Sequence, residues 1–357
     1  MSGTYTVLTR KRAIILLVAF VLAICAAIIN VVVGSSGLTA QEFFDAVFNP
    51  AAVNQRIYAI VWTMRLPIAA MGLIIGASLA CAGAVMQTIL NNPLASPYTL
   101  GVSAGASVGA SLVMVCGLSS LTILGSFALP AAAFVFALLA CFGIYIISLR
   151  GQFSSAFMIL AGIGMVFFFQ AIQSALQYFA SDEALSGIVF WTFGSLSKAN
   201  WINISIMICV FLVVFIVFLA SSWKLTAMRL GDDKARSMGV DVSRLRKVTF
   251  ILISLLTATA VSFVGSIGFV GIVAPHIARM IIGEDQRFFL PMSACLGAFL
   301  LSVASTVSKI ILPGVIFPIG IVTSLIGVPF FFFLLLKAGK GGCLLYTSDA
   351  ADDIALV

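Results

Sequence analysis

The fold is decided by residues 65–110, which read RLPIAAMGLIIGASLACAGAVMQTILNNPLASPYTLGVSAGASVGA. Two apolar runs, at 65–90 and 99–118, flank the polar turn NNPLASP, and Arg65 is the one charged residue in the stretch. An apolar helix of roughly 20 residues is long enough to cross the hydrocarbon core of a bilayer. These residues therefore predict two membrane-spanning helices joined by a short turn.

The rest of the chain has the same character. Of its 357 residues, 62% are apolar and 9% are charged, and the mean hydropathy is +1.21. A soluble protein of this size needs a charged and polar surface that this composition does not supply. We predict an all-α integral membrane protein with about ten spans, at residues 14–33, 65–90, 99–118, 124–149, 154–178, 202–222, 248–267, 270–283, 289–311 and 318–337. Nine spans are the alternative, because the seventh and eighth run together through GSIGFVG, residues 265–271.

The basic residues predict the orientation. If the N-terminus is cytoplasmic, fifteen of the nineteen Lys and Arg residues fall on the cytoplasmic side. The other side then holds Arg56, Arg65, Lys198 and Lys309. Basic loops remain in the cytoplasm, so ten spans with both termini cytoplasmic fit best. The net charge of +7 is explained in this way and does not indicate a partner nucleic acid.

Two further patterns concern packing and processing. Gly72 and Gly76, and then Gly101, Gly105 and Gly109, recur at the four-residue spacing that lets membrane helices approach closely, so they predict a compact bundle. The basic triplet at 10–12 precedes an apolar run at 13–33 without an A-x-A cleavage site. We interpret that run as an uncleaved first span.

Several function classes lack their motifs in this sequence. No Asp or Glu lies in the middle of a predicted span, which argues against a stand-alone secondary transporter coupled to an ion. There is no GxxxxGK[ST] loop for ATP and no HExxH motif for an intramembrane enzyme. The seven cysteines form no CxxC pair, so neither a disulfide framework nor a metal site is expected.

Further segments carry a family resemblance, namely LGDDKARSMGVDVSRLRKV (230–248), GFVGIVAPHIARMIIGEDQRFFLP (268–291) and PIGIVTSLIGVPFFFFLLLK (318–337). Together with residues 65–110, they closely resemble FecCD-type permeases. These are the membrane subunits of bacterial ABC importers for ferric siderophores, haem and cobalamin. The resemblance covers about residues 10–340 and implies one permease domain at 1–340, with an ATPase-coupling loop at 223–247.

The resemblance also implies an assembly. It predicts a BtuC-like type II importer fold in the bacterial cytoplasmic membrane, paired with a second copy of itself or a homologous permease. Two cytoplasmic ATPase subunits would bind ATP, and an extracytoplasmic binding protein would deliver substrate, so the chain itself needs no cofactor and no catalytic residue. We expect a ferric siderophore as substrate, with haem or cobalamin as the alternative. ABC permeases for free metal ions lack the RLP and GFVGIVAPH motifs.

In the family, the coupling loop forms two short helices that sit in a groove of the ATPase. Gly231 and Gly239 can break this segment into short helices. An apolar docking face and a polar rim are expected around them. The predicted face contains Leu230, Ala235, Met238, Val240 and Leu245, and the predicted rim contains Asp232, Asp233, Lys234, Arg236, Arg244 and Arg246. A solvated loop that only sets topology is the alternative.

On the other side of the membrane, the family uses basic residues to receive acidic residues of the binding protein. Arg65 matches the first Arg of the family's RLPR motif, although Ile68 replaces the second one here. Lys309 falls where another basic residue is common, and Arg56 is a possible substitute for the missing charge. Snorkelling of the cations to the membrane interface is the alternative.

The resemblance assigns the translocation path mainly to the fifth span. Gln170, Gln173 and Gln177 recur on one helical face near Ser174, and amides facing lipid would be costly. Hydrogen bonding between helices is the alternative. Ser154 and Ser155 match a gate region, while His276, the one histidine, is expected to be structural.

The chain ends in a segment that the family does not explain. After KAGKGG comes CLLYTSDAADDIALV, residues 343–357, with three acidic residues. We expect residues 341–357 to be an atypical tail, either a disordered extension or a non-native end.

Overall fold

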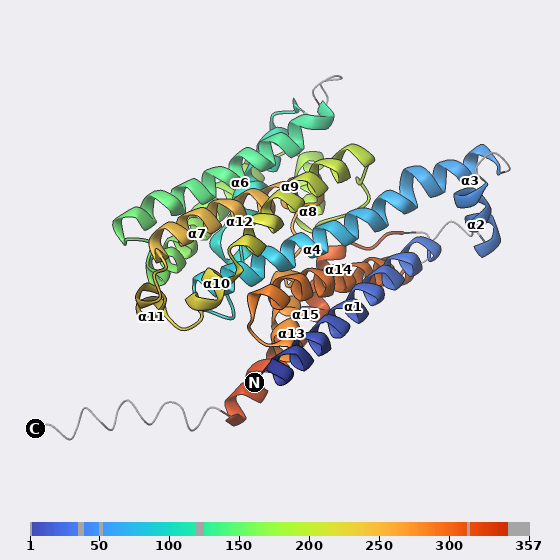
Figure 1. Ribbon diagram of the computed structural model, residues 1–357. Coiled ribbons are helices and arrows are strands. Elements are labelled where there is room, and N and C mark those ends of the chain that lie inside the picture. Colours follow the sequence, from blue (N-terminus) through green and yellow to red (C-terminus); the bar gives the residue numbers. More distant parts are fainter. Residues whose placement is uncertain (1, 35–38, 50–52, 119–124, 313–314, 342–357) are drawn as a thin grey trace, which may run out of the picture.

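The computed structural model describes residues 2–34, 39–49, 53–118, 125–312 and 315–341, and every regular element in these ranges is helical. The atypical tail from residue 342 onward lies outside the described residues (Figure 1). The longer helices are α1 (Ser2–Val32), α4 (Leu66–Ile89), α6 (Gly125–Arg150), α7 (Ser155–Phe179), α9 (Trp201–Ala220), α12 (Val242–Val264), α14 (Gln286–Ile310) and α15 (Ile319–Gly341). The shorter ones are α2 (Ala40–Phe48), α3 (Gln55–Ala59), η1 (Ile60–Arg65), η2 (Tyr98–Leu100), α5 (Val102–Val115), α8 (Asp182–Thr192), α10 (Ser222–Met228), α11 (Asp232–Ser237) and α13 (Val270–Ile282).

The all-α class is confirmed for the described residues. Seven helices among the described residues are long and apolar enough to cross a membrane, and α5, α13 and the first part of α15 are shorter apolar helices. Each of the ten predicted spans coincides with one of these helices. How many of them cross the membrane, and on which side the termini lie, stay predictions.

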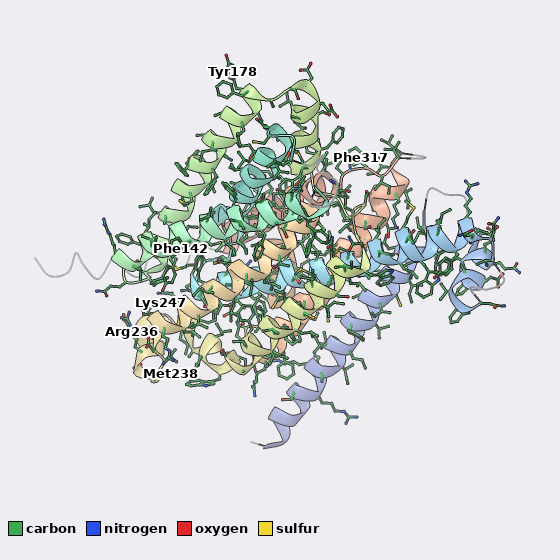
Figure 2. The ribbon with its side chains drawn as sticks, turned by 90° about the horizontal axis from the view of Figure 1, so that it is seen from above. Phe142, Tyr178, Arg236, Met238, Lys247 and Phe317 are labelled. Atoms are coloured by element: carbon green, nitrogen blue, oxygen red, sulfur yellow. The ribbon has the colours of Figure 1, made fainter. Side chains whose placement is uncertain are left out.

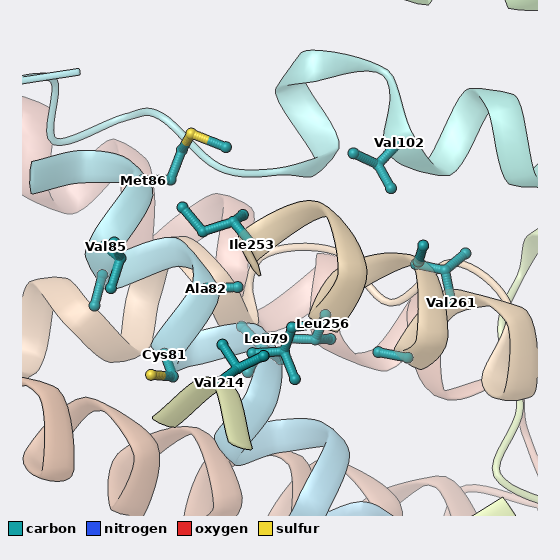
Figure 3. Packing of buried hydrophobic residues seen from close by; sticks show 14 of the residues in the cluster. Leu79, Cys81, Ala82, Val85, Met86, Val102, Val214, Ile253, Leu256 and Val261 are labelled. Carbon is teal, nitrogen blue, oxygen red and sulfur yellow. The ribbon is translucent and has the colours of Figure 1, made fainter. Parts of the chain in front are cut away.

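Helix α4 occupies the centre of the bundle (Figure 1). In the continuous helix Gln55–Ile89 that contains α4, 83% of the residues in its apolar window are buried, against 22% in α7. The reason is that α4 packs against α1, α9, α12, α13 and α14. Leu79 and Val85 of α4 meet Val214 of α9 and Leu256 of α12 in the main apolar core (Figure 3). The other helices are therefore arranged around α4.

Glycines allow α4 to approach two neighbours closely. A β-carbon on Gly76 would lie 2.3 Å from the backbone oxygen of Gly297 in α14, and one on Gly83 would lie 1.9 Å from that of Gly271 in α13. In the same way, Gly105 and Gly109 of α5 contact the backbone of α6. The predicted role in packing is confirmed for Gly76, Gly105 and Gly109, but not for Gly72, whose β-carbon would have ordinary contacts.

The predicted seventh and eighth spans are separate helices. The helix α12 ends at Val264, and α13 begins at Val270 after a non-helical turn. Backbone groups away from water must find partners. The N–H of Ile267 donates to the hydroxyl of Tyr98 at 3.0 Å, and the Oγ atoms of Ser103 and Ser266 lie 2.5 Å apart. This turn is thus held by η2 and α5.

Most charged residues of the described ranges gather at one end of the bundle, which we call the charged end. It contains the start of α1, the helices α10 and α11, and the turns between α6 and α7 and between α13 and α14 (Figure 1). Ion pairs join these segments, including one between Arg12 and Asp285 at 3.5 Å. The helices α2 and α3 lie at the opposite end.

Candidate functional site

The segment between α9 and α12 forms two short helices, α10 and α11, at the charged end. Gly231 and Gly239 flank α11 and have positive φ angles of +96° and +82°. Glycine adopts this backbone region readily, whereas other residues are strained there. These two positions therefore fix where α11 begins and ends. The prediction that they break the segment into short helices is confirmed.

The apolar residues of this segment divide into two groups. Leu230 and Met238 are 55% and 50% exposed, whereas Ala235, Val240 and Leu245 are buried against the protein itself. The buried group packs α11 against the bundle, and a hydrogen bond from the Val240 N–H to the Ala235 oxygen at 3.0 Å closes the end of α11. Leu230 and Met238 are thus the two of the five predicted docking side chains that are open to a partner, and the docking role stays a prediction.

A hollow of about 350 Å³ lies beside the two exposed apolar residues. We call it the coupling hollow, and it is lined by Trp223, Thr226, Ala227, Leu230, Met238, Asp285 and Arg287. Trp223 lies in the predicted coupling loop at 223–247 without being singled out there, and sequence reasoning does not identify Asp285 or Arg287 as members of this site. The charged run GEDQR at 283–287, which returns to the charged end, is the signal that could have found the last two.

One side of the coupling hollow carries a pair of opposite charges, Asp285 and Arg287. Asp285 caps the N-terminus of α14, and its carboxylate accepts hydrogen bonds from the Arg287 guanidinium at 2.7 and 3.0 Å. These bonds, with the charge of nearby Arg12, hold the pKa of Asp285 below its ordinary value. Asp285 is thus ionised at neutral pH, so the lining of the hollow combines charged with apolar side chains.

A second set of charged residues, next to the coupling hollow, connects α10 to the core helices α13 and α4. The Glu284 carboxylate pairs with Arg229, at the end of α10, and with Arg279 of α13 at 3.1 Å. Arg279 also donates to Gln87 of α4 at 3.0 Å, and Arg229 donates to Asn91 at 3.3 Å. One acidic side chain therefore joins α10, α13 and the end of α4.

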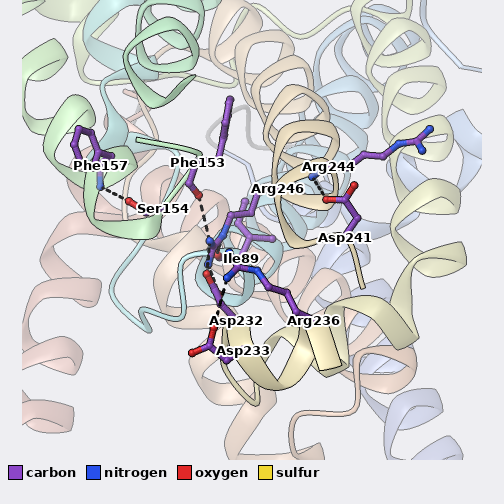
Figure 4. A network of polar contacts seen from close by, with 10 residues as sticks. All are labelled: Ile89, Phe153, Ser154, Phe157, Asp232, Asp233, Arg236, Asp241, Arg244 and Arg246. Atoms are coloured by element: carbon purple, nitrogen blue, oxygen red, sulfur yellow. Dashed lines mark hydrogen bonds and ion pairs between the residues drawn. The ribbon is translucent and has the colours of Figure 1, made fainter. Parts of the chain in front are cut away.

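Arg246 differs most from its prediction. We expected it on the polar rim, but its side chain is 2% exposed and forms two hydrogen bonds of 2.7 Å with the Asp232 carboxylate (Figure 4). The buried position follows from α12, which begins at Val242 and turns Arg246 inward. The other rim residues, Asp233, Lys234, Arg236 and Arg244, are exposed. Arg236 and Met238 lie together at one edge of the molecule, with Lys247 nearby (Figure 2).

Helix α7 presents a long uncovered face. Gln170 and Ser174 are exposed, and Gln173 and Gln177 are half-buried. The same helix exposes large apolar side chains, including Phe167 at 67%. Its contacts within this chain are with α5, α6 and η2. The mixed polar and apolar face suits the predicted path, but the role of these residues stays a prediction.

The two serines predicted as a gate lie where α7 begins. The hydroxyl of Ser154 accepts a hydrogen bond from the Phe157 N–H at 3.4 Å and caps the helix. Ser155 is the first helical residue and is half-buried. Both are thus fixed by the helix start at the charged end, and a gating role remains a prediction.

At the opposite end, two of the three residues predicted to receive a binding protein are buried within this chain, and their docking role stays a prediction. Arg65 and Lys309 are 5% and 7% exposed, and both cations bind carbonyls at the end of α1. Arg65 donates to the oxygens of Val31 and Val32 at 3.2 and 2.9 Å, and Lys309 donates to Asn30. The C-terminal end of a helix attracts cations, which explains why these side chains turn inward.

Of the three predicted docking residues, Arg56 alone is exposed. It lies in α3, which continues through η1 and α4 as one long helix. A docking role for Arg56 stays a prediction.

Replacing Lys309 with methionine tests the inward position. The Lys309 ammonium donates to the Asn30 backbone oxygen at 2.6 Å and to its Oδ1 at 2.7 Å. Hydrogen bonds to a charged group contribute about 1.5–3 kcal/mol. We expect the Lys309→Met variant to lose about 2 kcal/mol of stability in detergent, measured by thermal unfolding. Because the ammonium is buried, the affinity of the variant for a binding protein should equal that of the wild type. A large loss of that affinity would contradict the buried position of Lys309.

A larger hollow of about 760 Å³ opens near α8 and the end of α12. Aromatic side chains of Phe190, Trp191 and Phe263 line it together with the polar groups of Lys198 and Asn203. This hollow was not predicted from the sequence, because its walls come from segments far apart in the chain.

Known proteins are similar to this chain in sequence and in the arrangement of their helices. The model of the FecCD transport family matches residues 16–337. A cobalamin import system permease protein, BtuC, of Halobacterium salinarum is 37% identical, over 79% of this chain and 75% of that protein. A hemin transport system permease protein, HmuU, of Yersinia pestis is 33% identical, over 85% and 91%.

Two further matches extend the comparison. An iron(3+)-hydroxamate import system permease protein, FhuG, of Bacillus subtilis is 31% identical, over 92% of this chain and 98% of that protein. A solved inward-facing structure assigned to the metal-chelate type of ABC transporter superposes with a TM-score of 0.80. It is 29% identical and covers 90% of this chain and 99% of that chain. The match thus extends over nearly the whole bundle.

Proposed function

The chain belongs to the FecCD transport family, and we propose that it is the permease subunit of an ABC importer for a ferric siderophore or related iron chelate. Separate ATPase subunits would drive it, and a substrate-binding protein would supply it. The observation that carries the proposal is the match of the family over residues 16–337 in a chain with an exposed apolar hollow at its charged end.

The coupling hollow is suited to receive an ATPase subunit. Trp223, Leu230 and Met238 expose apolar surface beside a charged rim, which is the arrangement of a protein interface. The chain has no phosphate-binding loop of its own, so the energy of ATP must enter through another protein. We therefore place the ATPase on α10 and α11.

The charge distribution supports an orientation for the importer. Fifteen of nineteen basic residues fall on one side when ten spans are assumed, and α10 and α11 share that side. By the positive-inside rule, this side is cytoplasmic, as an ATPase partner requires. We propose ten spans with both termini in the cytoplasm of a bacterial cell.

The uncovered face of α7 supports a pathway between two permeases. Polar side chains such as Gln170 and Ser174 are unfavourable against lipid but suitable against a water-filled path. A second copy of this chain, or a homologous permease, would cover the large apolar side chains of the same helix. Substrate would then pass between the two α7 helices.

The relatives support the substrate class. Their names include an iron(3+)-hydroxamate, a hemin and a cobalamin system, all of which handle bulky metal chelates. Iron chelates are represented more than once, since an Fe(3+)-citrate permease of Bacillus subtilis also matches, at 32% identity. We favour a ferric siderophore, with haem or cobalamin as the second candidate.

Uptake in a deletion strain tests the proposal. Cells lacking the gene should lose uptake of one radioactively labelled chelate among ferric hydroxamate, ferric catecholate, haem and cobalamin. Expression of the chain should restore it, and uptake should require ATP. The purified chain should also carry an ATPase subunit with it. Normal uptake of all four compounds in the deletion strain, with no ATPase bound, would contradict the proposal.

A further inference from the structure

Arg246 is the centre of a buried network at the charged end. Its Nη1 and Nη2 atoms donate to the two carboxylate oxygens of Asp232, each at 2.7 Å (Figure 4). Asp232 is the first residue of α11, and Arg246 lies one turn inside α12. A bidentate pair between Arg and a carboxylate fixes orientation as well as distance. The short helix α11 is thus tied rigidly to α12.

The same guanidinium reaches two further segments. Its Nε atom donates to the backbone oxygen of Ile89, the last residue of α4, at 2.7 Å. Its Nη1 atom also donates to the backbone oxygen of Phe153 at 3.2 Å, in the turn between α6 and α7. Four segments, namely α4, the turn between α6 and α7, α11 and α12, therefore meet at one side chain that is 2% exposed.

The turn that Arg246 contacts is under conformational strain. Gln152 and Phe153 both have positive φ angles, +51° and +57°, which are unfavourable for residues with a β-carbon. The Phe153 ring is fully buried, 5.1 Å from the Tyr145 ring and 5.2 Å from the Lys247 ammonium. Such a turn persists only when its surroundings hold it. Arg246 supplies one of these constraints directly.

This turn also determines where α7 starts. Ser154, the residue after Phe153, is the N-cap of α7, and the uncovered face with Gln170 belongs to the same helix. A shift of the Phe153 carbonyl therefore shifts the start of α7. Two contacts, Asp232 to Arg246 and Arg246 to Phe153, connect α11 to that start.

We infer that Arg246 is a positioning residue that transmits movement of α11 to the beginning of α7 during transport. The inference rests on the proposed function, since it assumes that an ATPase moves α11. Lysine cannot replace arginine here, because an ammonium does not form the planar bidentate pair and reach two carbonyls at once. A positive charge on another nearby side chain would not connect α11 to the start of α7.

The first test measures the amount of chelate transported per ATP hydrolysed, in proteoliposomes with the ATPase and binding protein. In Arg246→Lys, we expect this ratio to fall about tenfold, a typical size for coupling between sites, while ATP hydrolysis continues. Arg10→Lys is the matched control, because Arg10 is an exposed arginine at the same end of the bundle, in α1. If Arg246→Lys left the ratio of chelate transported to ATP hydrolysed unchanged, including the case in which both rates fall equally, the inference would be overturned.

The second test needs neither substrate nor ATP. Amide hydrogen exchange is measured over residues 150–160 and 230–240 of the purified chain. Arg246→Lys should accelerate exchange about tenfold in both segments, and Asp232→Asn should do so as well. Faster exchange in 230–240 alone would show that Arg246 does not hold the start of α7, which overturns the inference. Failure of the proposed function instead appears as a wild-type chain without ATP-driven uptake, whatever its exchange.

Discussion

Replacing Gly83 with alanine will strongly destabilise the bundle. The new β-carbon would lie 1.9 Å from the backbone oxygen of Gly271, and backbone atoms on both sides leave no flexible side chain to give way. The helices α4 and α13 must then separate, which disturbs the most buried helix. Overpacking of this kind costs about 3 kcal/mol or more at the severe end. Thermal unfolding in detergent should show a large decrease in the unfolding temperature.

Gly164 provides a matched control for this change. It lies in α7, and a β-carbon there would have no neighbour within 4 Å. In a helix, alanine is favoured over glycine by about 0.5–1 kcal/mol. The Gly164→Ala variant should therefore unfold at the same or a slightly higher temperature. If both variants behaved alike, α4 and α13 could not be in the contact described above.

Placing aspartate at both Leu230 and Met238 will abolish ATP-driven uptake. These exposed side chains supply much of the apolar surface beside the coupling hollow, and an ATPase seated there would bury both new charges. Central interface residues contribute about 2 kcal/mol each, so the two changes should weaken binding of the ATPase roughly a thousandfold. The affinity can be measured with the permease in nanodiscs and the purified ATPase.

The fold should survive this double change, since both side chains are about half exposed and surface substitutions alter stability by about 0.5 kcal/mol or less. Phe48→Asp is the control. Phe48 is 79% exposed on α2, at the opposite end of the bundle. It should leave ATPase affinity unchanged. Equal binding by the double variant and the wild type would exclude α10 and α11 as the ATPase site.

The sequence predicted the positions of the apolar helices well, but not where each helix begins. The seventh predicted span starts at residue 248, whereas α12 starts at Val242, because Asp241 caps it within the charged segment. Likewise, the helix containing α4 begins at Gln55, ahead of the predicted residue 65. Hydropathy detects the part of a helix that suits lipid, while hydrogen bonding and capping determine its ends.

Side-chain direction within the candidate site could be predicted only where it is a local property. The break into short helices at Gly231 and Gly239 depends on the residue type, and that prediction was confirmed. The burial of Ala235, and the pairing of Arg246 with Asp232 fourteen residues away, depend on how distant segments pack. No periodicity in a six-residue helix reveals which side faces its own protein. Contacts of that kind require the folded chain.

The cations at the end of α1 have a consequence for biosynthesis. Arg65 follows Val31 by 34 residues, but Lys309 follows Asn30 by 279. At about 5–20 residues per second, the ribosome needs roughly 15–60 s to synthesise that interval. During this time Arg65 can bind the last carbonyls of α1, whereas Lys309, the partner of Asn30, has not yet been synthesised. The first helix to be synthesised is therefore among the last to complete its contacts. Until α14 has been made, Arg65 alone of these two cations can bind the end of α1.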